Sequence, residues 1–214
     1  MTGEILPPSK THAQMAYESL GRLKSVTTGI FVISLVVGFF VKHDGIFGGQ
    51  FASGLFQKLA FHTAHIDFFS LPRAVVSFFI HSDLIHLLTG FMFILPFGIY
   101  VEGKVSAFRY LVFCLASHLA SVLAQTLSSV LISSGAGYFV VGSSGVAFAL
   151  VGASVVLGKM RFTGVAVFLG LIYFLFAGDI GFGHAGHMAG FLFGFVVAAL
   201  GWLVQNPKAK EQVV

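Results

Sequence analysis

Residues 110–158, YLVFCLASHLASVLAQTLSSVLISSGAGYFVVGSSGVAFALVGASVVLG, form a run of 49 residues without Asp, Glu, Lys or Arg. A transmembrane helix needs about 20 consecutive apolar residues, so this run is long enough to cross a membrane twice. Its middle, 128–138, is rich in Ser and Gly, which is typical of a turn. The run therefore predicts two membrane-spanning helices joined by a short turn.

The composition of the whole chain also indicates a membrane protein. Charged residues make up 9% of the 214 residues and hydrophobic residues 57%, with a mean hydropathy of +0.94, whereas soluble domains average about 25% charged residues. So few charges exclude a soluble enzyme, and the 26 Phe exclude a disordered chain. A single cysteine, Cys114, excludes an intrachain disulfide framework and a Cys-based zinc site. We expect no cofactor, no metal and, because the basic residues are scattered, no nucleic-acid partner.

Further charge-free stretches lie between Lys24 and Lys42 and between Asp179 and Lys208. Together with the central run they predict an all-α polytopic protein, built as a bundle of six transmembrane helices. The expected spans are 25–41, 83–102, 107–127, 138–158, 162–178 and 184–204. The first and the fifth are short for a full crossing.

Lysine and arginine are distributed unequally between the two sides of such a bundle. With six spans both termini share a side, and that side carries nine basic residues against three on the other. The nine are Lys10, Arg22, Lys24, Lys104, Arg109, Lys159, Arg161, Lys208 and Lys210, and the three are Lys42, Lys58 and Arg73. Cytoplasmic loops are enriched in Lys and Arg, so we expect the tails 1–24 and 205–214 to be cytoplasmic. Residues 25–204 would form the membrane domain of a multi-pass protein in the plasma or inner membrane, without a cleavable signal peptide.

A long loop, from residue 42 to about residue 80, separates the first two spans. It contains eight Phe but too many polar residues to cross the bilayer. We expect short amphipathic segments that lie in the membrane interface. The alternative is a disordered Phe-rich linker.

Nucleophilic and ionisable side chains inside the spans are the candidates for function, because burying them in hydrocarbon is costly. They are His81 and His86 in the second span, Gly142-Ser143-Ser144-Gly145 in the fourth, and His184 and His187 in the sixth. Taken singly, each has a structural explanation. A serine often bonds back to its own helix, and small residues often only let two helices touch.

Depth in the membrane groups three of these side chains. Ser144 lies about six residues into the fourth span, His187 about three into the sixth and His86 about three into the second. At about 1.5 Å per residue, all three lie within ~10 Å of the outer interface. A nucleophile, a base and a hydrogen-bond donor would then share one level that water reaches from outside.

Small residues favour close contact between the fourth and sixth spans. They form two stripes, Gly145, Ala149 and Gly152 on the fourth span and Gly190, Gly194, Ala198 and Gly201 on the sixth. Such faces let helix backbones approach closely enough for a serine hydroxyl to reach an imidazole.

These motifs resemble the rhomboid family of intramembrane serine proteases, in its six-span core form, over about residues 25–204. The resemblance rests on Gly142-x-Ser144-Gly145, His187-x-x-Gly190-x-x-x-Gly194, His81 with His86, and Gly98-x-x-x-Glu102. It implies a Ser–His dyad without an acid, in which Ser144 is the nucleophile and His187 the general base. It also implies that His86 and the backbone N–H of Ser144 stabilise the oxyanion, that Phe148 lies against the imidazole, and that Gly142, Gly145, Gly190 and Gly194 support the site.

The resemblance further implies an endopeptidase that cleaves single-span membrane proteins near the outer face of the lipid bilayer. We expect a structural role for Glu102 at the inner end of the second span, tied to nearby backbone or to Lys104. His81 and His184 are expected near the outer rim, as structural or water-binding groups.

Position 90 departs from the family pattern. In the family pattern an Asn follows the second-span His by four residues and helps to hold the oxyanion, whereas this chain has Gly90 at that position. His86 and the backbone N–H of Ser144 are left. Because a single oxyanion donor contributes roughly 10²–10³ in rate, Gly90 predicts lower efficiency rather than a different mechanism.

Two alternatives stay open. One is a catalytically weak or inactive relative that binds membrane-protein clients. The other is a His-lined ion or metal transporter using His62, His65, His81, His86, His184 and His187, although carboxylates would usually accompany such ligands.

Overall fold

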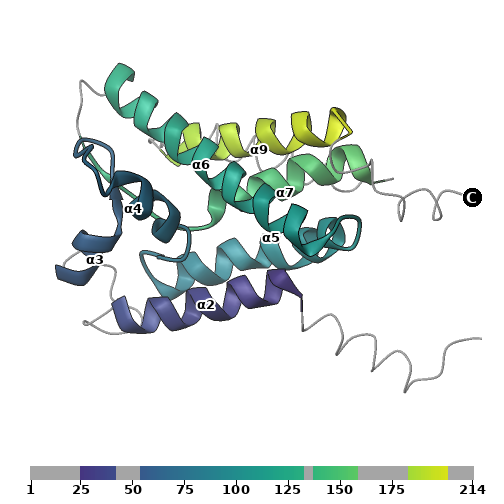
Figure 1. Ribbon diagram of the computed structural model, residues 1–214, viewed down its shortest axis with the longest axis horizontal. Coiled ribbons are helices and arrows are strands. Elements are labelled where there is room, and N and C mark those ends of the chain that lie inside the picture. Colours follow the sequence, from purple (N-terminus) through teal and green to yellow (C-terminus); the bar gives the residue numbers. More distant parts are fainter. Residues whose placement is uncertain (1–24, 42–53, 133–136, 159–182, 202–214) are drawn as a thin grey trace, which may run out of the picture.

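The computed structural model describes residues 25–41, 54–132, 137–158 and 183–201 (Figure 1). These residues are mostly helical and form seven helices and a two-stranded sheet. The helices are α2 (Val26–Val41), α3 (Gly54–Leu59), α4 (Ser70–Ser77), α5 (Leu84–Glu102), α6 (Ala107–Ile132), α7 (Ser144–Leu157) and α9 (Gly183–Ala199). The strands are β1 (Phe61–His62) and β2 (Phe139–Val140).

Five of these helices form the apolar bundle. Two segments, Leu84–Glu102 and Ala107–Leu131, are long and apolar enough to cross a membrane, and the apolar parts of α2, α7 and α9 are shorter. Figure 1 shows α2 beside α5 and α7 beside α9, with α6 crossing the bundle obliquely. A core containing Phe91, Phe113 and Leu150 joins α5, α6 and α7.

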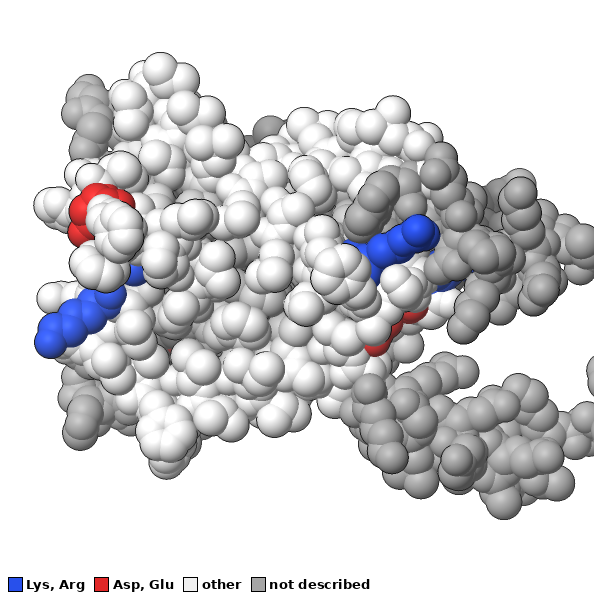
Figure 2. All heavy atoms as spheres, viewed as in Figure 1, with Lys and Arg blue, Asp and Glu red and all other residues white. Residues whose placement is uncertain are grey.

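Charged side chains avoid the middle of the bundle. In the face shown in Figure 2, Lys, Arg, Asp and Glu appear at the two ends, and the surface between them is uncharged. Large apolar side chains are exposed on the bundle helices, among them Met92, Leu123 and Leu192. In water such a surface would be costly, whereas in lipid it is not.

The fourth predicted span, 138–158, is wrong at its start. Residues 139 and 140 pair antiparallel with 62 and 61 in the small sheet, and Gly142 has a φ of 99° that no helix allows. The helix therefore begins at Ser144, which is its first residue rather than the sixth or seventh of a longer span.

The other predicted spans agree with the structure to different extents. α2 and α5 lie within one residue of the predicted 25–41 and 83–102, and α6 continues to Ile132, beyond the predicted end at 127. The predicted span 162–178 and the tails 1–24 and 205–214 lie outside the described residues.

The described part of the long loop, 54–80, is ordered as α3, β1 and α4, so a disordered linker is wrong for these residues. Residues 42–53 of the loop lie outside the described residues. α4 buries Ala74 and Ser77 and leaves the apolar residues near its start exposed, among them Phe68 at 90%. One face of this segment is therefore apolar and accessible, as expected for a membrane interface.

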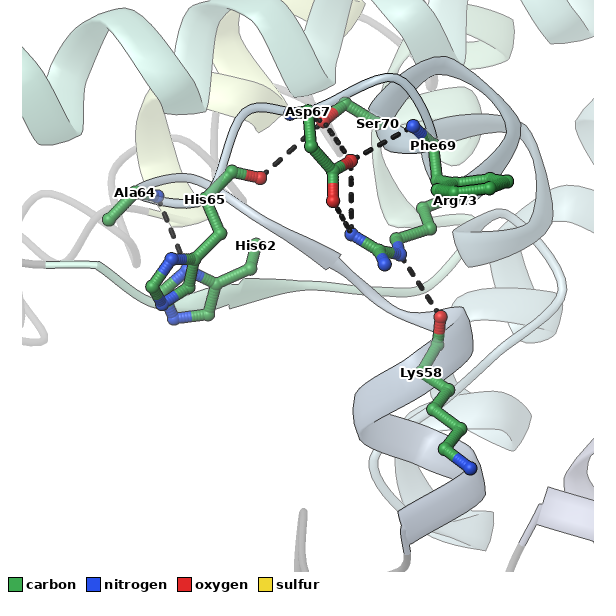
Figure 3. A network of polar contacts seen from close by, with 8 residues as sticks. All are labelled: Lys58, His62, Ala64, His65, Asp67, Phe69, Ser70 and Arg73. Atoms are coloured by element: carbon green, nitrogen blue, oxygen red, sulfur yellow. Dashed lines mark hydrogen bonds and ion pairs between the residues drawn. The ribbon is translucent and has the colours of Figure 1, made fainter.

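Arg73 ties α4 to the segments before it (Figure 3). Its guanidinium forms an ion pair with Asp67 at 3.0 Å, and its Nε donates to the carbonyl of Lys58 at 3.1 Å. Desolvation acts to raise the pKa of Asp67, but the hydrogen bonds from Arg73 and Ser70 outweigh it, and that pKa is lowered. The ion pair thus fastens the loop before α4 to α4 itself.

Glu102 joins three helices at the opposite end. Its carboxylate accepts the backbone N–H groups of Val26 at 2.7 Å and Thr27 at 3.0 Å, and the hydroxyl of Thr27 at 2.7 Å. Thr27 Oγ1 also lies 2.8 Å from the hydroxyl of Tyr110 in α6. A carboxylate at a helix N-terminus satisfies orphan donors and complements the helix dipole, so Glu102 caps α2 from the last turn of α5.

Glycines bring the backbones of α7 and α9 into direct contact. A Cβ at Gly190 would overlap the carbonyl of Gly145, and one at Gly194 would overlap the carbonyl of Ala149. From the other helix, a Cβ at Gly152 would overlap the carbonyl of Phe191. The two helices therefore pack at a distance that only glycine permits at these positions.

We predict that Gly190→Ala destabilises the protein by about 1–3 kcal/mol, because the added methyl group forces a rigid backbone contact apart. Gly38→Ala is the matched control, since a Cβ at Gly38 meets nothing within 4 Å and alanine favours the helix. The free energy of unfolding in detergent micelles measures both. Equal stability of the two variants would show that α7 and α9 do not touch at Gly190.

Candidate active site

The first residue of α7 and the fifth residue of α9 meet at one end of the bundle. Ser144 Oγ lies 2.9 Å from His187 Nε2, although the two residues are 43 positions apart in the chain. The glycine contacts described above set this distance, because they fix the two helices laterally. A serine hydroxyl can donate to an unprotonated imidazole nitrogen at this distance.

The His187 ring is held by packing. Phe148, one turn after Ser144 on α7, stacks on it with ring centroids 4.6 Å apart and planes 22° apart. The described part of the chain contains three carboxylate residues, and each binds another group: Asp67 binds Arg73, Asp83 caps α5 and Glu102 caps α2. Stacking on Phe148 therefore restricts the orientation of the His187 ring.

His86 lies beside the turn that precedes Ser144. A Cβ at Gly142 would lie 2.7 Å from His86 Cε1 and 3.0 Å from Nε2, so this edge of the imidazole faces the Gly142 backbone. Two features therefore require glycine at position 142: its positive φ and its close contact with the His86 ring.

Two groups of Ser82 contact Nδ1 of His86, the backbone N–H at 3.4 Å and Oγ at 3.0 Å. The backbone N–H can only donate to Nδ1, whereas the Ser82 hydroxyl donates its one proton to Asp83 Oδ2 at 2.8 Å, so that its oxygen is free to accept from Nδ1. These contacts are compatible with either tautomer of His86. Asp83 Oδ1 accepts the backbone N–H of His86 at 2.6 Å and fixes the start of α5. Nε2 of His86, the other ring nitrogen, faces the Gly142 backbone in the turn before α7.

Ser143 and His81 form a contact that sequence reasoning missed. His81 Nε2 lies 3.1 Å from Ser143 Oγ and 3.3 Å from Ser143 N. His81 is 5% exposed and Ser143 0% exposed, so His81 is a buried structural group rather than a water-binding one. The sequence does not indicate this pair, because the contact depends on the conformation of the turn before α7, where Gly142 has a positive φ.

The N-terminus of α7 has no side-chain cap. Ser143 occupies the capping position but its hydroxyl makes no capping hydrogen bond. The first N–H groups of an α-helix have no partner within the helix, and they carry the positive end of its dipole. The uncapped start of α7 therefore lies at Ser144 itself, and His86 lies beside Gly142, two residues earlier in the chain.

Gly90 lies one turn after His86 and leaves space. A Cβ at this position would meet one described atom within 4 Å, Ser143 Oγ at 3.8 Å, which is an ordinary van der Waals contact. Residue 90 thus supplies no side-chain donor, although the space beside it would accommodate a Cβ.

The remaining histidines have other contacts. His184 lies against His187 with ring centroids 6.3 Å apart, and His62 against His65 at 4.5 Å. His118, which sequence reasoning also missed, is buried in α6, and its Nε2 donates to the carbonyl of Ala74 in α4 at 2.8 Å. Within the described ranges no group of three or more His, Cys, Asp or Glu is arranged to hold a metal ion, which gives the transporter alternative no support.

Comparison with known proteins agrees with this geometry. The family model described as the Rhomboid domain matches residues 69–204, well over half of the chain. No curated protein matches the sequence. The match extends over α4, α5, α6, α7 and α9, which carry Ser144, His187, His86 and Phe148. The chain belongs to the rhomboid family.

Proposed function

We propose that this protein is an intramembrane serine endopeptidase whose catalytic groups are Ser144 and His187. The observation that carries the proposal is the 2.9 Å separation of Ser144 Oγ and His187 Nε2. Rhomboid proteins are generally intramembrane serine proteases, so this contact occurs in a family whose chemistry requires it.

The first step is the attack of Ser144 on a peptide carbonyl. A hydroxyl is a weak nucleophile until a base removes its proton, and a neutral imidazole is suited to that task near neutral pH. His187 Nε2 takes the proton as Oγ forms a bond to the carbonyl carbon. Stacking on Phe148 keeps the ring in place while its charge changes.

The attack places negative charge on the carbonyl oxygen. The backbone N–H of Ser144, at the start of α7, and Nε2 of His86, in the tautomer that is protonated there, are the donors proposed to hold it. Donors fixed in advance in a site with little water stabilise such a charge strongly.

The intermediate then collapses. His187 returns its proton to the leaving amine nitrogen as the peptide C–N bond breaks, which leaves an ester between Ser144 and the acyl half of the substrate. A water molecule, activated by the same imidazole, hydrolyses the ester and frees the serine. The balance is one water consumed for each peptide bond broken.

The substrate class follows from the surroundings of the site. The uncharged surface and the exposed apolar residues of the bundle support a location in lipid, and Ser144 lies near one end of the bundle. We therefore propose single-span membrane proteins as substrates, cut near the end of their helix where the backbone can unwind. With both termini cytoplasmic, this end would be the outer one.

A second candidate function is supported by Gly90. Because residue 90 provides no side-chain donor, the site could bind membrane-protein clients and cleave them slowly or not at all. The two candidates differ in the turnover of the wild-type protein in detergent or liposomes, with a panel of transmembrane substrates.

We predict that Ser144→Ala and His187→Ala each abolish cleavage of a transmembrane substrate and leave the protein folded. Because the dyad acts as a unit, the double variant should be scarcely slower than either single one. Ser154→Ala, which removes a buried hydroxyl from the same helix, is the matched control and should keep its activity. Substantial cleavage by purified Ser144→Ala would refute the assignment.

We predict that His86→Ala lowers kcat by roughly 10²–10³ with a smaller change in KM, because its hydrogen bond strengthens as the oxyanion forms. Gly90→Asn, which adds a donor one turn along the same face, should raise kcat or partly restore His86→Ala. Thr89→Asn, on the exposed side of α5, is the control for the added amide. An unchanged kcat in His86→Ala would show that α5 does not contribute to the active site.

We predict that Phe148→Leu lowers kcat about tenfold or more, because a branched aliphatic side chain cannot stack on the imidazole and small misplacements are costly. Phe148→Tyr keeps the ring and should retain most of the activity. Comparable rates for Leu and Tyr at this position would mean that the stacking does not orient His187.

A further inference from the structure

We propose that His81 is a positioning residue, which holds the hydroxyl of Ser143 away from α7 so that the start of the helix stays open for the oxyanion. This inference rests on the proposed function. It concerns the residue before the nucleophile rather than the nucleophile or the base.

A serine immediately before a helix normally caps it. The capping residue has an extended backbone, and its hydroxyl oxygen accepts the N–H of the second or third helical residue. Ser143 does neither, because its φ and ψ are −89° and 10° and its side chain makes no capping bond. The best capping residue type therefore stands at the capping position and does not cap.

His81 accepts hydrogen bonds from both donor groups of Ser143. Its Nδ1 lies 3.3 Å from the carbonyl of Phe79, which can only accept, so Nδ1 carries the proton and Nε2 is an acceptor. The hydroxyl and the backbone N–H of Ser143 converge on that nitrogen at 3.1 Å and 3.3 Å. Both side chains are buried, so water does not compete for these bonds.

The segment around Ser143 is held on a second side. The backbone N–H of Gly142 donates to the carbonyl of Ser77 at 2.9 Å, and the rings of His81 and His86 lie 5.2 Å apart, edge to face. His81 therefore fixes the conformation of Ser143 within a frame that also contains the proposed oxyanion donor His86.

A capping hydroxyl would interfere with catalysis. Its oxygen would lie over the end of α7, on the N–H groups of Gly145 or Val146, with its lone pairs facing the negative oxygen of the intermediate. With the hydroxyl turned to His81, the positive end of the helix is left to the substrate. Because of the contact between His81 and Ser143, α7 has no side-chain cap and its first N–H groups stay available to an anion.

The test compares the wild type with His81→Phe, Ser143→Ala and the double variant. His81→Ala serves as a second form of the substitution at position 81. Phenylalanine keeps the ring volume but cannot accept a hydrogen bond. We expect His81→Phe to lower kcat by roughly tenfold to a hundredfold with little change in KM, since Ser143 then caps α7 over the proposed oxyanion site. Ser143→Ala should lose no more than about fivefold.

The decisive result is suppression. Alanine at position 143 cannot cap, so the double variant should regain at least about tenfold in kcat over His81→Phe. A purely structural role for His81 would make the double variant as slow as the single one or slower. That outcome would overturn the inference.

A second measurement does not depend on activity. Hydrogen exchange of the Gly145 and Val146 amides should slow in His81→Phe relative to wild type, and return to the wild-type rate in the double variant. Unaltered exchange of these amides in His81→Phe would show that His81 does not keep Ser143 from capping α7. If the wild type cleaves nothing, the proposed function is wrong, and the exchange comparison still decides whether His81 keeps Ser143 from capping α7.

Discussion

α7 and α9 touch backbone to backbone, and this contact fixes the relative position of the two helices that carry Ser144 and His187. Gly190 and Gly194 lie directly against the carbonyls of Gly145 and Ala149, so the two helices are held closer than side chains would allow. Ser144 and His187 are on these helices, near the same end. Their 2.9 Å separation therefore follows from glycines that carry no reactive group themselves.

Polar groups around this contact bind one another in pairs that span different elements. His118 of α6 holds α4, whose last residue accepts the N–H of Gly142, and His81 holds Ser143. A buried polar group in an apolar surrounding is costly unless it is hydrogen-bonded. These pairs therefore both satisfy the buried groups and place the turn before α7. The same turn carries the glycine that faces His86.

Much of the helical frame could be predicted from the charge-free runs, because a membrane helix requires about 20 apolar residues whatever its neighbours are. The start of α7 could not, since residues 139 and 140 look equally apolar in a helix or a strand. A pairing with residues 61 and 62, far away in the sequence, decides between them. Ser144 and His187 could be singled out because a nucleophile and a base are chemically distinctive. Ser143 and His81 could not be paired, because their contact depends on side-chain direction in a turn with a positive φ.

Labelling with a fluorophosphonate tests whether His187 activates Ser144, because this reagent reacts with a serine only when a neighbouring base activates it. The purified protein in detergent would be treated with the probe, and the modified residue located by mass spectrometry of its peptides. We expect modification of Ser144, and loss of that modification when His187 is replaced by Ala. Modification of a different serine, or equal modification of Ser144 without His187, would contradict the assignment of this dyad.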